Sequence, residues 1–319
     1  WWKSLPFPLE ACKVSSGTRP EGFRFHSDIV NIEAVLKGKS MIVCGEANCS
    51  ELAMTKAVAE LIERSTLWKW NKANIKNLKS SNGWAAHISI EAAKQSAILE
   101  LVERDAVLAQ WYSSTPFLEI DPNDLPFCTK KWRDKELSKS EFPIMRILIS
   151  TKGIGPSVTC VFMNKKGHGV VSHATREFLS QAIESAIAEA CRAAHLYLRK
   201  AFWEDTLSIR NGQKQKIDPG AHSVYYAYHE TLPGWMFGDV VSWTSASQYW
   251  EKSLEQISFE EFKFQKVLED PLIVGFADHQ EAFNLEWGPT DINSISKMAA
   301  SRRLSPNKTE WNLNPHIIS

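Results

Sequence analysis

Residues 97–104 read Ala-Ile-Leu-Glu-Leu-Val-Glu-Arg, and residues 57–64 repeat the pattern as Ala-Val-Ala-Glu-Leu-Ile-Glu-Arg. Each copy has two glutamates three residues apart, and an arginine follows the second. Side chains at i and i+3 share one face of a helix, so each copy sets two carboxylates side by side. Apolar neighbours place this face at the border of the core. A partly buried carboxylate pair needs a counter-charge.

The counter-charge can come from two sources. Arg64 and Arg104 supply part of it, and a hard cation such as Mg²⁺ supplies more, because this ion prefers carboxylate and phosphate oxygens. A weaker third copy, Ala-Ile-Ala-Glu-Ala-Cys-Arg, lies at residues 186–192. One such copy is typical of a salt-bridged helix surface. Two near-identical copies and a third echo favour several helices that converge on one cation-rich site.

The hydrophobic pattern outside these copies mixes helices with hairpin-connected strands. Helical spacing predicts helices over residues 53–70, 90–112 and 176–202. Short apolar runs between Gly, Pro and polar turns predict strands at residues 40–44, 144–150, 157–163, 169–172, 223–228 and 272–277. The aromatic run at 225–228 is assigned to one of these strands. Mixed helices and antiparallel hairpins predict the α+β class.

Composition excludes several classes of protein. The chain has 319 residues with 37 Lys+Arg and 37 Asp+Glu, a balance that argues against a protein that coats nucleic acid or an anionic membrane. No apolar run is long enough to span a bilayer, and no signal peptide is recognisable. The six cysteines lack metal-binding spacing, so we expect mostly buried thiols in a reduced, cytoplasmic protein. No P-loop sequence occurs.

Two further segments complete a recognisable pattern. Residues 81–86 read Ser-Asn-Gly-Trp-Ala-Ala and lead into the helix that ends Glu103-Arg104-Asp105, and residues 313–316 read Leu-Asn-Pro-His. Together with the first copy and Glu189, these segments resemble the YcaO-like family, whose members use ATP to modify peptide backbone amides. The recognisable segments run from about residue 40 to residue 316.

The resemblance implies a fold and a site. It implies one YcaO-like catalytic domain over residues 1–319, with a subdivision near 115–140, in which mixed and antiparallel sheets and long helices surround a central ATP cleft. It also implies that ATP and Mg²⁺ are bound. The implied nucleotide-binding residues are Glu60, Glu63, Arg64, Ser81, Asn82, Glu100, Glu103, Arg104 and Glu189. The implied metal ligands are Glu60, Glu63, Glu100 and Glu103. The catalytic residues stay unassigned, and Pro315 and His316 are offered as candidates.

The activity implied by the resemblance is cyclodehydration. Cys, Ser or Thr of a ribosomally made precursor peptide would become thiazoline or oxazoline, as in the biosynthesis of azole-modified antibiotic peptides. The expected partners are that peptide, a separate E1-like or leader-binding protein, because no leader-binding domain is evident before residue 40, and a flavin dehydrogenase. Neither nucleic acid nor a membrane is an expected partner, and a homo- or hetero-oligomer is compatible with the sequence.

Departures from the family pattern keep alternatives open. Glu46 lies in a loop where the family often has Lys, His87 replaces a Gly, and Ser185 replaces a frequent Arg. Residues 317–319 also lack the family's terminal Pro-x-Pro-x-Pro. The alternatives are thioamide or amidine formation by the same ATP chemistry, and a non-catalytic scaffold subunit of a complex that modifies peptides or ribosomal proteins.

Overall fold

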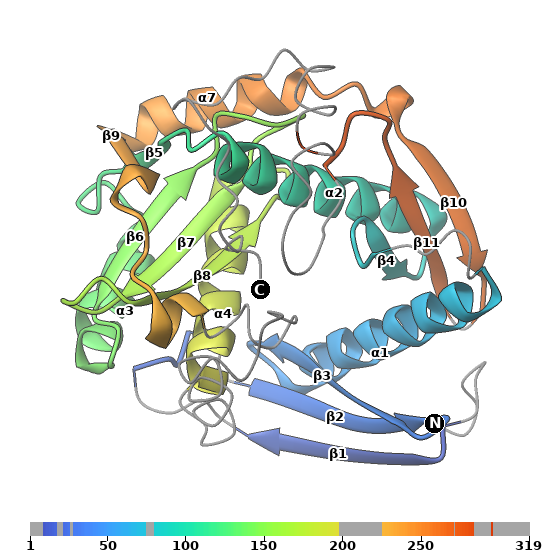
Figure 1. The fold of residues 1–319 in the computed structure, drawn as a ribbon. Helices are drawn as coiled ribbons and strands as arrows, with labels where there is room; N and C mark the ends of the chain where they lie inside the picture. The colour runs from blue at the N-terminus through green and yellow to red at the C-terminus, as the bar shows by residue number, and fades with distance from the viewer. Residues whose placement is uncertain are drawn as a thin grey trace. The chain divides into compact units, whose positions relative to one another are not determined.

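The computed structural model describes residues 9–17, 22–25, 28–74, 80–197, 225–270, 272–283 and 295 (Figure 1). The chain divides into two compact units. The first comprises residues 1–19, 26–101 and 259–279, and the second comprises residues 20–25, 102–258 and 280–319. The two ranges meet inside the long helix α2 (Ile90–Tyr112).

The first unit begins with an antiparallel meander of three strands, in the order β1-β2-β3. These strands are β1 (Ala11–Gly17), β2 (Asp28–Leu36) and β3 (Lys39–Ala47). Lys37 and Gly38, both with positive φ, form the tight turn between β2 and β3. The helix α1 (Ser50–Ala73) packs on β3 and β2. It approaches so closely that a Cβ at Gly45 would overlap the backbone of Ala53 and Ala57.

A second small sheet completes the first unit, in the antiparallel order β10-β11-β4. Its strands are β4 (Trp84–His87), β10 (Lys263–Leu268) and β11 (Ile273–Asp278). Trp84 and Phe276 pack with ring centroids 4.9 Å apart. Both side chains belong to the same buried cluster as Leu61 of α1. One hydrophobic core therefore supports α1 and the strand that follows the Ser-Asn-Gly turn.

The second unit is built on a five-stranded sheet in the order β8-β7-β6-β5-β9. Its strands are β5 (Phe117–Ile120), β6 (Ile144–Ile149), β7 (Val158–Met163), β8 (Gly169–Ala174) and β9 (Phe237–Val241). All neighbours are antiparallel except β5 and β9, which are parallel.

The two faces of this sheet support different helices. One face packs against α4 (Leu179–Tyr197) and α7 (Trp243–Glu255), as the shared core of Ile183, Ala186 and Trp250 shows. The short helices α3 (Phe127–Lys135) and η3 (Leu137–Lys139) precede β6. The other face packs against the last turns of α2 through Leu108 and Trp111. Along β8, Val171 belongs to the core shared with α2, whereas Ala174 belongs to the core shared with α4.

Most of the expected elements are confirmed. The helices predicted at 53–70 and 90–112 are α1 and α2, and the third is α4, whose residues after 197 lie outside the described ranges. The strand predicted at 223–228 is wrong, because Tyr225–His229 form one π-helical turn, η4. Tyr226 is buried in this turn, and its ring packs against Trp111 of α2 with ring centroids 5.6 Å apart. This tertiary contact favours the helical turn over an extended strand. The α+β class with mixed sheets and long helices is confirmed, whereas the single-domain assignment stays a prediction.

All six cysteines are free, and Cys160 and Cys191 are the two buried ones. The expectation that most of them are buried is therefore wrong, because the other four sit on helix ends or strand faces that reach the surface. Among helices of the described residues, none combines the length and the apolar character that a membrane crossing requires.

Candidate nucleotide and metal site

The first Glu-x-x-Glu-Arg copy lies on α1, in the first unit. One oxygen of Glu60 accepts a hydrogen bond from the backbone N–H of Cys44 in β3 at 3.0 Å, and the other lies 2.7 Å from the Arg64 guanidinium. The Glu60 side chain is 21% exposed and that of Arg64 55%. Glu63 is half-buried on the same helix. The first copy therefore has protein partners that already compensate the charge of Glu60.

The Ser-Asn-Gly turn precedes β4 in the same unit. Ser81 is exposed, whereas Asn82 is buried. Neither the amide nitrogen nor the amide oxygen of Asn82 has a hydrogen-bond partner among the described residues. Gly83 has φ +68°, and a Cβ there would meet the carbonyl oxygen of Ala277 at 2.9 Å. The turn thus needs glycine and presents an amide with unused hydrogen-bonding capacity, as a ligand-binding residue would.

The second copy lies on α2. Glu100, in the first unit, is half-buried, and Glu103, in the second unit, has a side chain only 7% exposed. Glu103 accepts a hydrogen bond from the backbone N–H of Thr175, just after β8, at 3.2 Å. The Arg104 guanidinium lies 3.7 Å from its other oxygen. A single backbone donor and one distant guanidinium are weak compensation for a buried carboxylate.

The pKa of Glu103 agrees with this weak compensation. Burial raises the pKa of the Glu103 carboxyl to about 7. Arg104 opposes this rise in pKa, Glu189 on α4 adds to it, and Arg176 and the Thr175 N–H oppose it. The carboxyl groups of Glu103 and Glu189 thus interact in the second unit, and the buried Glu103 is the more weakly compensated of the two.

Arg176 and Arg192 complete this group, and the motifs did not indicate either as a binding residue. Arg192, on α4, lies 3.3 Å from Glu189. Arg176 is exposed at the junction between β8 and α4, and its guanidinium donates to the carbonyl of Thr175 at 2.8 Å. The one sequence signal for Arg176 is its position as a basic residue between a predicted strand and a predicted helix. The second unit therefore offers two carboxylates among three arginines, a mixture that suits a metal–polyphosphate ligand.

Two buried polar side chains on α2 hold the neighbouring segments. Asp105 accepts hydrogen bonds from the backbone N–H groups of Ile154, at 2.7 Å, and Phe283, at 2.9 Å. One turn further on, the oxygen of Gln110 accepts from the N–H groups of Thr151 and Lys152, both at 2.9 Å. The helix that carries Glu103 thereby fixes the loop between β6 and β7. Asp105 is structural, although it follows directly on the acidic motif.

Pro315 and His316, the two candidates for catalysis, lie outside the described residues. Their role stays a prediction.

The described residues fit Mg²⁺ as a shared ligand rather than as an ion held by protein alone. Among them, no three His, Cys, Asp or Glu side chains gather closely enough to hold a metal ion by themselves. Mg²⁺ usually takes one or two carboxylates and completes its coordination with water and substrate phosphates. The weakly compensated Glu103 and the neighbouring Glu189 supply carboxylate oxygens of this kind.

A comparison with family models decides the family. Residues 73–261, more than half of the chain, match the model of the YcaO cyclodehydratases, which is described as binding ATP and Mg²⁺. The chain belongs to the YcaO family. The expected cofactors, ATP and Mg²⁺, are thereby confirmed. The matched range contains the Ser-Asn-Gly turn, the second acidic copy and Glu189, whereas Glu60, Glu63 and Arg64 precede it.

Solved structures agree on the fold. A YcaO protein from Methanopyrus kandleri, solved with AMPPCP and Mg²⁺, is similar with a TM-score of 0.57 at 13% identity, over 88% of this chain and 89% of that chain. A heterocyclase solved with substrate and cofactor is similar with a TM-score of 0.61 at 10% identity. That similarity covers 96% of this YcaO chain and 54% of the heterocyclase chain. No curated protein matches the chain.

Proposed function

We propose that this YcaO protein activates backbone amides of a precursor peptide with ATP and Mg²⁺, and so converts Cys, Ser or Thr residues to thiazolines or oxazolines. The observation that carries the proposal is the buried, under-compensated Glu103 beside Glu189 and three arginines, in a chain of the cyclodehydratase family.

The proposed reaction balances with the peptide and ATP alone. The thiol or hydroxyl of the substrate side chain gives up its proton to solvent and attacks the preceding amide carbonyl. A C–S or C–O bond forms, and the C=O double bond becomes a single bond to an oxyanion. That oxygen attacks the γ-phosphorus of ATP, and ADP leaves. Loss of the nitrogen proton and departure of phosphate then form the C=N bond of the ring. The net change in the peptide is the loss of one water.

The chain's own residues would position the phosphates and stabilise their charge. Mg²⁺, when bound, neutralises carboxylate and phosphate oxygens together. We propose Glu60, Glu63, Glu100 and Glu103 as metal ligands, and Glu189, which interacts with Glu103, as a further nucleotide-binding residue. Arg64, Arg104 and the newly recognised Arg176 would meet phosphate oxygens. Asn82 would use its unpartnered amide on the nucleotide, and Ser81 lies next to it.

The partner assignment follows from the same chemistry. The heterocyclase of similar fold was solved with a substrate and a cofactor. For this chain we infer a peptide substrate, delivered by a leader-binding protein, with a flavin dehydrogenase where azolines are oxidised to azoles.

A direct test incubates the protein with ATP, Mg²⁺, the cognate peptide and the leader-binding protein, and follows ADP release and peptide mass. Loss of water from the peptide in step with ADP release is the expected result. Glu103→Gln should abolish both, and Lys165→Gln, on the exposed β7–β8 turn, is the matched control. Intact ATP with unchanged peptide mass would refute the cyclodehydratase proposal.

Two alternative functions are distinguished by experiment. Exchange of oxygen for sulfur, or addition of an amine, would give a thioamide or an amidine with a different product mass. Ser185 and Glu46 motivate the other alternative, a non-catalytic scaffold. Calorimetry with ATP and Mg²⁺ separates this scaffold from an ATP-dependent enzyme, because a scaffold that has lost the nucleotide site would give no binding heat.

A further inference from the structure

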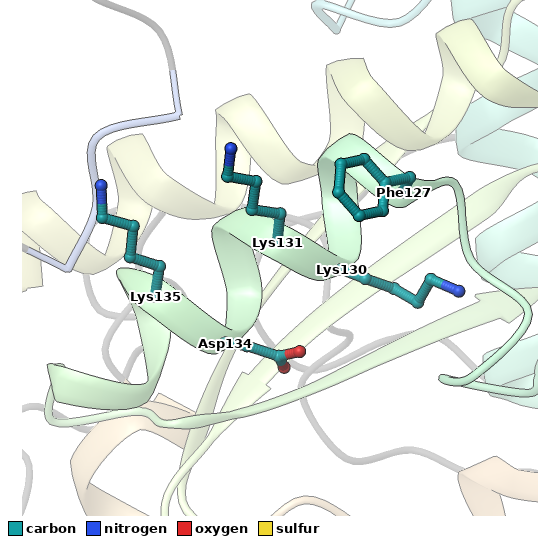
Figure 2. A pocket seen from close by; sticks show the side chains of 5 residues that line it. All are labelled: Phe127, Lys130, Lys131, Asp134 and Lys135. Atoms are coloured by element: carbon teal, nitrogen blue, oxygen red, sulfur yellow. The ribbon is translucent and has the colours of Figure 1, made fainter.

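One face of α3, far along the chain from the acidic motifs, carries lysines beside an exposed aromatic ring. Phe127, Lys131 and Lys135 recur at every fourth position, so they form one row on the helix. Figure 2 shows this row, with Lys130 and Asp134 projecting beside it, and the five side chains line one shallow pocket.

Among the described residues, the lysines of this row have little compensation for their charge. Asp134 is hydrogen-bonded by Arg133 at 2.7 Å, which holds the pKa of the Asp134 carboxyl below its ordinary value. The ammonium group of Lys130 donates to the carbonyl of Asn123 at 2.8 Å. Lys131 and Lys135 are exposed, and within the described part of the chain neither has an ion-pair or hydrogen-bond partner. Two free ammonium groups therefore stand one helical turn apart.

Phe127 gives the row an apolar end. Its side chain is 77% exposed, the highest fraction among the phenylalanines of the described residues. Isolated exposed apolar residues are ordinary, but aromatic residues are enriched at interfaces, and here the ring lies next to lysines that can attract an acidic partner.

The opposite side of α3 is firmly packed. Thr129 is buried, and the Trp132 ring packs edge-on against Phe25, with centroids 5.2 Å apart. The Trp132 indole N–H donates to the carbonyl of Arg24 at 3.1 Å. The helix thus presents its outer row from a fixed backbone, which lowers the entropic cost of binding a partner.

We propose that this row, Phe127, Lys131 and Lys135 with Lys130 beside it, is a docking surface for an acidic polypeptide segment that carries an apolar residue. The lysines would pair with carboxylates, and the apolar residue would cover Phe127. A nucleic-acid backbone is a poorer fit, because the chain as a whole balances 37 Lys+Arg against 37 Asp+Glu and lacks the overall positive charge that such binding favours. The proposal does not depend on the ATP chemistry.

A labelled synthetic peptide, rich in Glu with one Phe, tests the surface by fluorescence anisotropy with the full-length protein. Lys131→Glu/Lys135→Glu should weaken binding at least about tenfold, because each substitution turns attraction into repulsion. The matched control Lys165→Glu/Lys166→Glu makes the same charge change on another exposed turn of the unit and should bind as the unmodified protein does. Phe127→Ala should weaken binding by a smaller factor that is insensitive to salt.

Two exposed cysteines report where the peptide lies. Cys128 is on α3 and Cys49 is in the first unit, and both thiols are free. Peptide should slow alkylation of Cys128, followed by mass spectrometry, and leave Cys49 unchanged.

Equal binding by the α3 variant and the control variant, or protection of both cysteines, would overturn the proposal. Tighter binding of single-stranded DNA than of the peptide through the same lysines would overturn it in favour of nucleic acid. Glu103→Gln should bind the peptide normally, so loss of ATP turnover in that variant leaves this test intact.

Discussion

The two Glu-x-x-Glu-Arg copies are nearly identical in sequence but differ in environment. On α1, Glu60 is compensated twice, by the Cys44 N–H and by Arg64. On α2, Glu103 is almost fully buried, has one backbone donor and feels the charge of Glu189. The same motif therefore ties a helix to a sheet in one place and places a weakly compensated carboxyl group in the core in the other. We expect the α2 copy to dominate function, whereas the α1 copy contributes mainly to stability.

The largest expected effect is the loss of ATP turnover when the α2 copy is substituted. Glu103→Gln should lower ATP turnover at least about a hundredfold, because it removes charge that positions the metal and the phosphates. Glu60→Gln should lower turnover much less. Steady-state ADP release, with folding of both variants checked by circular dichroism, measures the contrast. Equal losses in the two variants would contradict the ranking.

The pH dependence of stability sharpens the same contrast. In metal-free protein, folded Glu103 keeps its proton up to about pH 7, whereas the unfolded chain loses it near its ordinary pKa of 4.5. The folded state therefore binds more protons in this window, so stability should fall as pH rises from about 4.5 to about 7, by at most about 3 kcal/mol.

Urea unfolding across this pH range in the presence of EDTA measures the fall. Glu103→Gln should flatten it. In a separate series without EDTA, ATP with Mg²⁺ should reverse it, because a bound cation favours the charged carboxylate. An unchanged slope in the Glu103→Gln variant would show that another group causes the fall.

A third prediction concerns the close packing of α1, which carries the first copy, on β3. Gly45→Ala should destabilise the protein by roughly 2 to 3 kcal/mol, because the added Cβ would overlap α1 at Ala53 and Ala57. Gly17→Ala, where nothing lies within 4 Å of the new Cβ, is the matched control and should change stability by less than about 0.5 kcal/mol. Thermal unfolding compares the two, and similar losses would contradict the close approach of α1 to β3.

The smallest effects concern the partners of Glu60. Glu60→Gln should cost about 1 kcal/mol, since it weakens the bond from the Cys44 N–H and the pair with Arg64. Arg64→Ala should cost only a few tenths of a kcal/mol, because its side chain is exposed and the pair is an i,i+4 surface pair. Chemical denaturation resolves the difference, and a larger loss in the Arg64 variant would assign the stabilisation to the ion pair.

Regular spacing made part of this fold predictable. The helical period of α1, α2 and α4 and the hairpin turns around β7 were visible in the sequence. The strand β1 was not, because all but one of its residues are exposed and no alternation marks it. The four-residue strands β4 and β5 are too short for a period, and α3 has few apolar residues.

The candidate site was predictable only where it follows a motif. The carboxylates on α2 could be located, but not the burial of Glu103 that distinguishes them from those on α1. Thr175 and Arg176 come from the end of β8, and tertiary pairing brings them to Glu103. The unused amide of Asn82 is likewise a consequence of packing, since an Asn-Gly turn is ordinarily exposed.

The hydrogen bonds between α2 and the β6–β7 loop have a consequence for backbone motion. The amide hydrogens of Thr151, Lys152 and Ile154 point at side chains buried in the core, Gln110 and Asp105. A surface loop ordinarily exchanges its amide hydrogens with solvent quickly. Here the exchange of these three should be as slow as that of α2 itself, so that the loop opens only when the helix does.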